Sequence, residues 1–231
     1  MTATAMLLFG SHARGDQDSR SDTDLLLITQ EDSQRHVVKG HLSTSLYSFE
    51  NLRDRAKNGD LFVGHIVREA KAIYDPGGQL NVLQSEFRLR RSYDDEIQRA
   101  TDLGWFLIDH GASMINASLV NKRIAWCVRT ILISRSAESG NPVFSASSLA
   151  EFARSRFVLT LIKNKDEEIV IIDILRSLEV VLANFGGERT FKKRGGYTDY
   201  RKRFVDTRNH VGLGTLKADA EELLTYHVLS V

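Results

Sequence analysis

The stretch that decides the fold is Leu7–Gly15, LLFGSHARG, followed after six residues by Asp22–Ile28, DTDLLLI. Each segment contains an apolar run that is typical of a buried strand, and a glycine-serine turn and a short polar loop separate the two runs. In a strand, residues two positions apart point to the same face, so Asp22 and Asp24 present two carboxylates side by side. Two adjacent carboxylates repel each other unless a cation lies between them.

This carboxylate pair has the chemistry of a magnesium ligand set. Mg²⁺ prefers hard oxygen ligands, and one or two carboxylates together with phosphate oxygens satisfy that preference. The backbone N–H groups of a turn that leads into a helix, here Gly10 and Ser11, can hold the phosphate that such a metal bridges. The pattern therefore predicts a metal–triphosphate site.

The composition is that of an ordinary globular protein. The 231 residues are 42% hydrophobic and 26% charged, and the net charge of +1 gives no sign of a general nucleic-acid binder. No apolar segment approaches the ~20 residues of a membrane helix, and the N-terminus lacks a secretory signal. The single cysteine, Cys127, excludes an internal disulfide framework, and its apolar neighbours predict a buried, inert thiol. We therefore expect a cytoplasmic protein without a membrane segment.

Strand and helix signals alternate in the first third of the chain. Strands are expected over residues 4–9, 24–29, 36–49 and 72–74. Helices are expected over residues 11–17, 49–57 and 60–71. The continuous apolar run in the second strand predicts a central strand that is covered on both faces. In the third strand, the alternation predicts that Val38, Leu42 and Leu46 point inward.

The segment Asp75–Gly78, DPGG, is the clearest boundary in the chain, because proline and glycine interrupt regular structure. Beyond it, helical periodicity replaces the strand signals. Helices are expected over residues 79–110, 116–138, 146–164, 166–185, 197–209 and 216–228. This order predicts an α/β head over residues 1–77 and an all-α domain over residues 78–231.

The order of the motifs resembles the signature of the polymerase-β-like nucleotidyltransferase superfamily, in its minimal nucleotidyltransferase branch. That signature is an apolar strand, a Gly-Ser turn, a short loop, and Asp-x-Asp in the next strand. Here it is matched by Gly10-Ser11, by Ala13-Arg14-Gly15 and by Ser21-Asp22-Thr23-Asp24-Leu25. The resemblance implies an α+β fold, with a small mixed-sheet nucleotidyltransferase head followed by a helical-bundle domain.

The resemblance also implies roles for these residues. Gly10 and Ser11 would contact the β- and γ-phosphates of a nucleoside triphosphate, with ATP as the expected substrate. Asp22 and Asp24 would be the catalytic pair and would hold Mg²⁺, which aligns the α-phosphate and neutralises charge on the leaving pyrophosphate. Arg14 lies close enough in sequence to add a cationic donor to the phosphates. The implied reaction moves a nucleoside monophosphate to an acceptor hydroxyl and releases pyrophosphate.

A third carboxylate, which the family usually carries on the next strand as metal ligand and base, is missing from the expected place. Ser43 and Ser45 stand there, and a neutral hydroxyl is a poor substitute for an anionic ligand. The nearby His41 would serve as a base near neutral pH, and Glu69 and Asp75 are more distant candidates. Two hypotheses follow: an enzyme, or a non-catalytic nucleotide- or partner-binding module derived from this fold.

The sequence does not identify the acceptor of the nucleoside monophosphate. The resemblance implies an acceptor bound between head and helical domain: a partner protein, as in antitoxin-type members that adenylylate a toxin, an RNA 3′ end, or a small molecule. The basic clusters Arg88–Arg91 and Lys192–Arg194 with Arg201–Arg203 would suit RNA, although a solvated basic face is the simpler interpretation. Arg203 and His210 match the Arg-x(4–6)-His spacing of HEPN ribonucleases, but one such pair assigns no catalysis.

Overall fold

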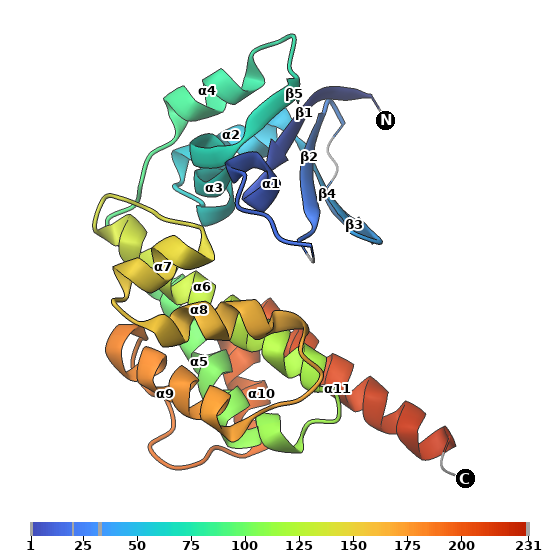
Figure 1. Ribbon diagram of the computed structural model, residues 1–231, viewed down its shortest axis with the longest axis vertical. Helices are drawn as coiled ribbons and strands as arrows, with labels where there is room; N and C mark the ends of the chain where they lie inside the picture. The colour runs from blue at the N-terminus through green and yellow to red at the C-terminus, as the bar shows by residue number, and fades with distance from the viewer. Residues whose placement is uncertain (1, 20, 32–33, 230–231) are drawn as a thin grey trace. The chain divides into compact units, whose positions relative to one another are not determined.

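The computed structural model describes residues 2–19, 21–31 and 34–229, with side chains described as far as residue 222. It divides the chain into two compact units, which we call the head, Met1–Arg91, and the helical unit, Ser92–Val231. Figure 1 labels their helices and strands. Over the described ranges, no helix combines the length and the apolar character that crossing a membrane requires.

The head is a five-stranded mixed sheet in the order β3-β4-β2-β1-β5. Strand β2 pairs in parallel with β4 and antiparallel with β1, so it occupies the middle of the sheet as its apolar sequence predicts. The elements of the head are β1 Ala3–Phe9, α1 Gly10–Arg14, β2 Thr23–Thr29, β3 Arg35–Lys39, β4 Leu42–Ser48, α2 Phe49–Lys57, α3 Leu61–Glu69, β5 Lys71–Tyr74 and α4 Gln79–Glu86. The α+β class predicted from the sequence is confirmed.

Helices α2 and α3 cover one face of this sheet (Figure 1). Leu26 and Ile28 of β2 are fully buried in that face, next to Leu7 of β1, and pack with the apolar sides of the two helices. Residues at alternate positions, such as Leu25 and Leu27, point to the other face and are half-buried. Since Asp24 has the same parity as Leu26, its carboxylate belongs to the helix-covered face, at its end.

The third predicted strand, 36–49, is two strands joined by a tight turn. Gly40 has a φ of +59°, which glycine adopts without strain, and the turn lets β3 fold back antiparallel to β4. The inward direction expected for Val38 and Leu42 is therefore wrong, because their side chains are 60% and 41% exposed.

The sequence predicts the domain boundary at the Asp75–Gly78 segment. The head extends past this segment, because α4 packs against the rest of the head. Leu80 and Leu83 belong to the hydrophobic core of the head, and the Arg53 guanidinium on α2 pairs with the Glu86 carboxylate at 2.5 Å. Phe87 then packs against Gly64, and the Arg88 N–H donates to the Ala56 carbonyl. These contacts end the helix predicted over 79–110, so that α4 and the next helix are separate.

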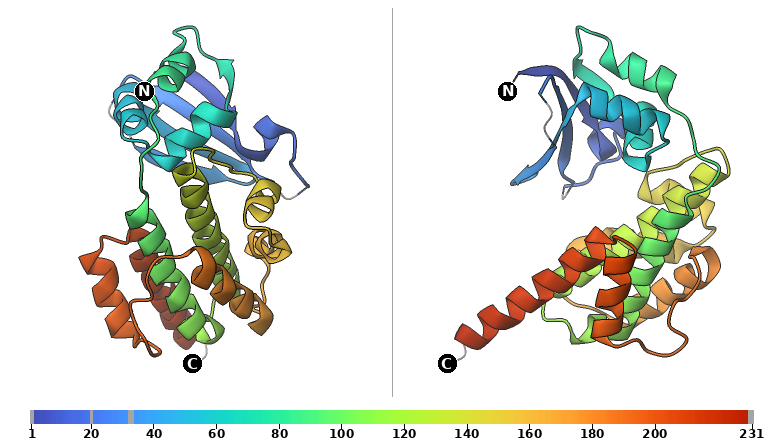
Figure 2. Two further views of the ribbon diagram at one scale, coloured as in Figure 1. Left: turned by 90° about the vertical axis from the view of Figure 1, so that its left-hand side faces the viewer. Right: turned by 180° about the vertical axis from the view of Figure 1, so that it is seen from behind.

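The helical unit has its own continuous core, to which α5, α6, α8 and α9 contribute most of the buried side chains. Figure 2 shows these helices in two further views. Its helices are α5 Asp94–His110, α6 Ala117–Glu138, α7 Ala146–Phe152, α8 Arg156–Lys163, α9 Ile172–Phe185, α10 Tyr197–Asp206 and α11 His210–Leu229. Two short 3₁₀ turns, Gly111–Ser113 and Asn164–Asp166, join some of them. Helix α6 agrees with its prediction closely, whereas the predicted helix 146–164 is broken at Arg154, whose φ is +50°.

The prediction that Cys127 is a buried, inert thiol is confirmed. Its side chain is fully buried in the core of the helical unit, and burial raises the pKa of the thiol far above its usual range. A protonated, enclosed thiol is unreactive.

Candidate active site

The glycine-serine turn and the first carboxylates meet where β1 ends and β2 begins. Phe9 of β1 pairs with Asp24 of β2, and Gly10 follows at once with a φ of +73°. A Cβ at Gly10 would lie 2.6 Å from the Asp24 Oδ2 atom, a separation that real Cβ atoms essentially never show. Glycine is therefore required here twice, for its backbone conformation and for the close approach of the carboxylate.

Strand β4 lies on the other side of Asp24 and brings no acid. Asp24 is the register partner of Ser43, and Leu26 is the partner of Ser45. Both serine side chains are largely buried, and the Ser45 hydroxyl lies 3.2 Å from Nδ1 of His36 on β3. The structure thus places Ser43 beside Asp24, in the position at which the resemblance implies a third carboxylate.

His41 is held close to the carboxylate pair from the β3–β4 turn. Its carbonyl accepts a hydrogen bond from the Thr23 N–H at 2.7 Å, and its Nδ1 atom lies 3.6 Å from Asp22 Oδ1. The imidazole is 78% exposed. The other two candidates have different partners: Asp75 accepts from the backbone N–H groups of Gln79 and Leu80 and so begins α4.

Glu69, the remaining candidate, lies in an ion-pair network with Arg14. The Arg14 Nη1 atom donates to Glu69 Oε2 at 2.5 Å, and its Nε atom donates to Asp16 at 3.1 Å. His65, one turn earlier on α3, lies 2.8 Å from the same Glu69 oxygen. Burial opposes ionisation of Glu69, but the hydrogen bonds from His65 and Arg14 outweigh it and hold the pKa of the carboxyl below its usual value.

This network fixes α1 on α3. Phe9, which precedes Gly10, packs edge-on against the rings of His65 and Phe62, with ring centroids 5.5 and 5.7 Å apart. The residues on both sides of the Gly10-Ser11 turn, Phe9 and Arg14, are thus held by the same helix. Sequence reasoning missed His65, because its aromatic contact, Phe9, lies far from it in the chain, although its charged partner Glu69 is only four residues away.

The residues present fit a divalent cation. Asp22 and Asp24 share one face at the start of β2, and the absent side chain of Gly10 leaves the space next to Asp24 open. In the ranges that the structure describes, no three His, Cys, Asp or Glu side chains gather closely enough to enclose a metal. Two carboxylates are a sufficient protein share for Mg²⁺, which keeps water molecules and takes phosphate oxygens as its other ligands.

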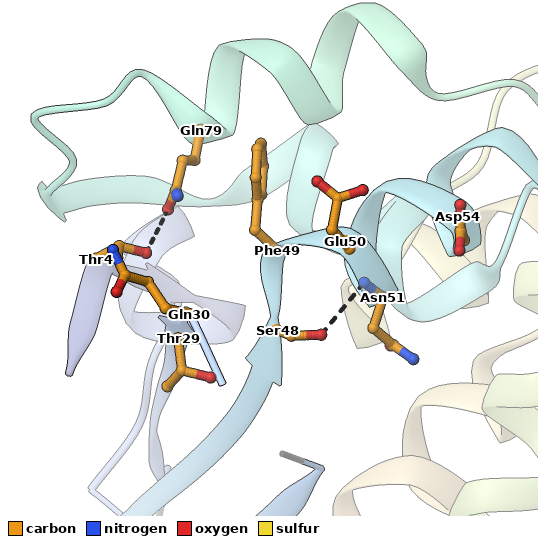
Figure 3. A pocket seen from close by; sticks show the side chains of 9 residues that line it. All are labelled: Thr4, Thr29, Gln30, Ser48, Phe49, Glu50, Asn51, Asp54 and Gln79. Carbon is orange, nitrogen blue, oxygen red and sulfur yellow. Dashed lines mark hydrogen bonds between the residues drawn. The ribbon is translucent and has the colours of Figure 1, made fainter. Parts of the chain in front are cut away.

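A pocket lies at the other end of the same sheet, away from Gly10 and Asp24. It has a volume of about 560 Å³ and opens between the end of β2 and the beginnings of α2 and α4 (Figure 3). Thr29 in its wall follows Asp24 by five strand residues, a separation of ~17 Å. We call it the far pocket. Its lining consists of Thr4, Thr29, Gln30, Ser48, Phe49, Glu50, Asn51, Asp54 and Gln79.

The charge of the far pocket does not suit a triphosphate. Figure 3 shows Thr4 and Gln79 joined by a hydrogen bond of 3.0 Å, and the Glu50 and Asp54 carboxylates on one side of α2. Among the described residues that line it, these two carboxylates are the charged side chains, and none is a lysine, arginine or histidine. Arg53, outside this lining, pairs with Glu50 at 3.3 Å. The described lining thus offers phosphate groups no cation of its own, and the size of the pocket alone is no reason to place a nucleotide there.

Comparison with known families assigns the head. Residues 3–76 match the family model described as the nucleotidyltransferase domain. The head is a nucleotidyltransferase domain. The matched residues include Gly10, Ser11, Asp22 and Asp24 and end just before the α4 segment that completes the core of the domain.

No curated protein sequence matches the chain. Among solved structures, the chain is similar to a nucleotidyltransferase-like protein from Exiguobacterium sibiricum 255-15, at 15% sequence identity. The match covers 99% of this chain and 86% of that one, with a TM-score of 0.32, which is too low to establish a common fold. The assignment of the nucleotidyltransferase domain therefore stands on the family model.

Proposed function

We propose that the protein transfers a nucleoside monophosphate from a nucleoside triphosphate, with ATP as the preferred donor, to an acceptor hydroxyl and releases pyrophosphate. The observation that carries this proposal is the contact between Gly10 and Asp24 inside a nucleotidyltransferase domain. It puts a turn suited to phosphate next to a carboxylate suited to a divalent cation.

In this proposal, the backbone N–H groups of Gly10 and Ser11 donate hydrogen bonds to the β- and γ-phosphates. Asp22 and Asp24 would hold Mg²⁺, which supplies charge neutralisation at the phosphates when it is bound. Arg14 would act chiefly by fixing α1, since Glu69 and Asp16 already accept its hydrogen bonds. These residues bind and orient the triphosphate for in-line attack.

The proton of the attacking hydroxyl needs an acceptor, and β4 offers no carboxylate for it. The presence of Ser43 beside Asp24 favours a second candidate function, a nucleotide- or partner-binding module that does not turn over. For the enzyme, the acceptor would be a protein side chain, as in a toxin–antitoxin pair, an RNA end, or a small molecule.

The test uses ATP labelled at the α-phosphate, Mg²⁺, and a cell extract that supplies protein, RNA and small-molecule acceptors. The proposal predicts pyrophosphate release together with label in one acceptor fraction, and loss of both in Asp22→Asn/Asp24→Asn. Release that persists in the double variant would refute the site. ATP binding that depends on both aspartates, without transfer to any fraction, would establish the binding module instead.

A further inference from the structure

The loop between α9 and α10, residues 187–196, has no regular structure but is firmly attached to α5. At its beginning, the Gly187 N–H donates to the Thr101 hydroxyl at 2.8 Å. Near its end, the Gly195 N–H donates to Asp109 at 3.0 Å, and the Gly195 carbonyl lies 2.8 Å from His110 Nε2. We call this segment the basic loop.

Two buried carboxylates of α5 are the main anchors. Asp102 is 1% exposed and accepts hydrogen bonds from the Thr190 hydroxyl at 2.7 Å and from Arg203 Nε at 2.8 Å. Asp109 accepts from the buried Tyr200 hydroxyl at 2.7 Å, and burial together with this carboxylate raises the pKa of that phenol. Burying a carboxylate costs free energy unless hydrogen bonds satisfy it. The hydrogen bonds of Asp102 and Asp109 therefore hold the backbone of this loop in one conformation.

The cations in this region separate into two groups. Arg203 turns inward to Asp102, and Arg189 lies over the Trp105 ring at 3.8 Å. The others are exposed, and none has an ion-pair partner among the residues that the structure describes. This second group consists of Lys192, Lys193 and Arg194 in the basic loop and Arg201 and Lys202 on α10.

The basic loop leads directly into α10, so the two halves of the second group lie close together. Arg201 stands four residues into α10, which is ~6 Å along the helix axis. Tyr197, at the beginning of α10, is 38% exposed and lies between the two halves in sequence. Its ring is fixed edge-on against Phe106 at 5.4 Å, and its hydroxyl lies 3.3 Å from Asp219.

From this arrangement we infer that the basic loop and the outer side of α10 form a binding surface for single-stranded RNA. Unpaired cations held on a fixed backbone match a chain of phosphates, because no ion pair must be broken before the phosphates bind. A half-exposed, immobilised aromatic ring beside them offers a face on which a base can stack. This inference concerns the helical unit and does not rest on the transfer reaction proposed for the head.

The experiment measures binding of the whole protein to a short fluorescein-labelled single-stranded RNA of mixed sequence, by fluorescence anisotropy. For single strands, log affinity falls with log salt by about 0.7 per neutralised phosphate, so five contacts predict a slope of about −3.5. Lys192→Gln/Lys193→Gln/Arg194→Gln should reduce this slope to about −1.4 and weaken binding more than about tenfold at low salt.

A matched variant controls for net charge. Lys122, Arg156 and Lys163 are exposed on α6 and α8, and their replacement by Gln removes the same number of charges from other helices. The inference predicts less than about a twofold change in this control. Circular dichroism and thermal unfolding verify that both variants fold.

Three results would overturn the inference. The first is that the wild-type protein does not bind the RNA saturably. The second is that both triple variants lose affinity equally, because an equal loss would indicate general charge attraction. In the third, an acidic peptide or a vesicle containing anionic lipid would displace the RNA at equal charge concentration, and the partner would then be of that class. Displacement by neither competitor, with the loss confined to the basic-loop variant, is the result that the inference predicts.

Discussion

The two ends of the head sheet differ in the way that they would meet a ligand. At one end, Gly10 and Asp24 are so close that no side chain fits between them, and no large hollow is needed. At the other end, the far pocket encloses about 560 Å³ but presents Glu50 and Asp54. If the triphosphate binds at Gly10 and Asp24 as proposed, its site depends on backbone N–H groups and a carboxylate pair that can hold a cation, and the larger cavity is not the nucleotide site.

The largest expected effect is at the carboxylate pair. Asp22→Asn/Asp24→Asn keeps the size of both side chains but removes the charge that would hold Mg²⁺. We expect nucleotide transfer to fall by at least about 10³-fold, the order that charged groups contribute in phosphoryl chemistry. The measurement is pyrophosphate release from labelled ATP, with thermal unfolding as the check on folding. Retention of more than a tenth of the activity would contradict the assignment.

Gly10→Ala should have the next largest effect. The new Cβ would displace the Asp24 carboxylate, so Mg²⁺-dependent ATP binding should weaken by about ten- to a hundredfold, equivalent to 1.4–2.8 kcal/mol. Gly15→Ala is the matched control, because Gly15 also has a positive φ, +82°, but no atom lies within 4 Å of its Cβ position.

Both variants carry the backbone strain of a positive φ, about 1–2 kcal/mol. The two variants should therefore have similar thermal stability, whereas calorimetric titration should show weaker ATP binding in Gly10→Ala than in Gly15→Ala. Equal ATP affinity in the two variants would show that the contact between Gly10 and Asp24 has no part in binding.

Glu69→Gln tests how the end of the sheet that carries Gly10 and Asp24, here called the motif end, is held in place. The Glu69 side chain is 14% exposed and accepts hydrogen bonds from Arg14 and His65, so we expect a loss of about 1–3 kcal/mol in the free energy of unfolding. Because the folded-state pKa of Glu69 is lowered, this stabilisation is present above a pH of about 5 and fades as the pH falls through that pKa.

Urea unfolding of the wild-type protein and of the variant, at neutral and acidic pH, measures this difference. Glu50→Gln, whose side chain is 76% exposed, is the control and should stay within about 0.5 kcal/mol of the wild type. A Glu69→Gln effect that is equal at both values of pH would exclude the ionised network as its cause.

The smallest effect is expected at the far pocket. Glu50→Gln/Asp54→Asn removes both carboxylates from its lining and should change ATP affinity by less than about twofold, because the proposed nucleotide site lies ~17 Å away. Titration with ATP and Mg²⁺ measures this. A change in ATP affinity of tenfold or more in either direction would contradict the proposal that the nucleotide binds away from the far pocket.

The motif end was predictable from sequence because its signals are local. The apolar runs, the Gly10-Ser11 turn and the spacing of Asp22 and Asp24 all lie within one short stretch, and they predict the central strand and the class of fold. The absence of an acid beside Asp24 was also visible, since Ser43 and Ser45 are the residues that β4 presents on that face.

What sequence reasoning missed depends on contacts between distant residues. Arg14 pairs with Glu69, which lies 55 positions away, so no spacing rule indicates the pair. The break after α4 has no proline or glycine to announce it and results from the packing of Phe87 on Gly64. Gly40 did announce the β3–β4 turn, but the regular alternation on both sides of it favoured one long strand.

The most direct test is a crystal structure of the protein with a non-hydrolysable ATP analogue and Mn²⁺, whose anomalous scattering locates the metal. The account predicts an anomalous peak bound by Asp22 and Asp24, with the β- and γ-phosphates against the N–H groups of Gly10 and Ser11. A triphosphate in the far pocket, or an anomalous peak away from both aspartates, would contradict it.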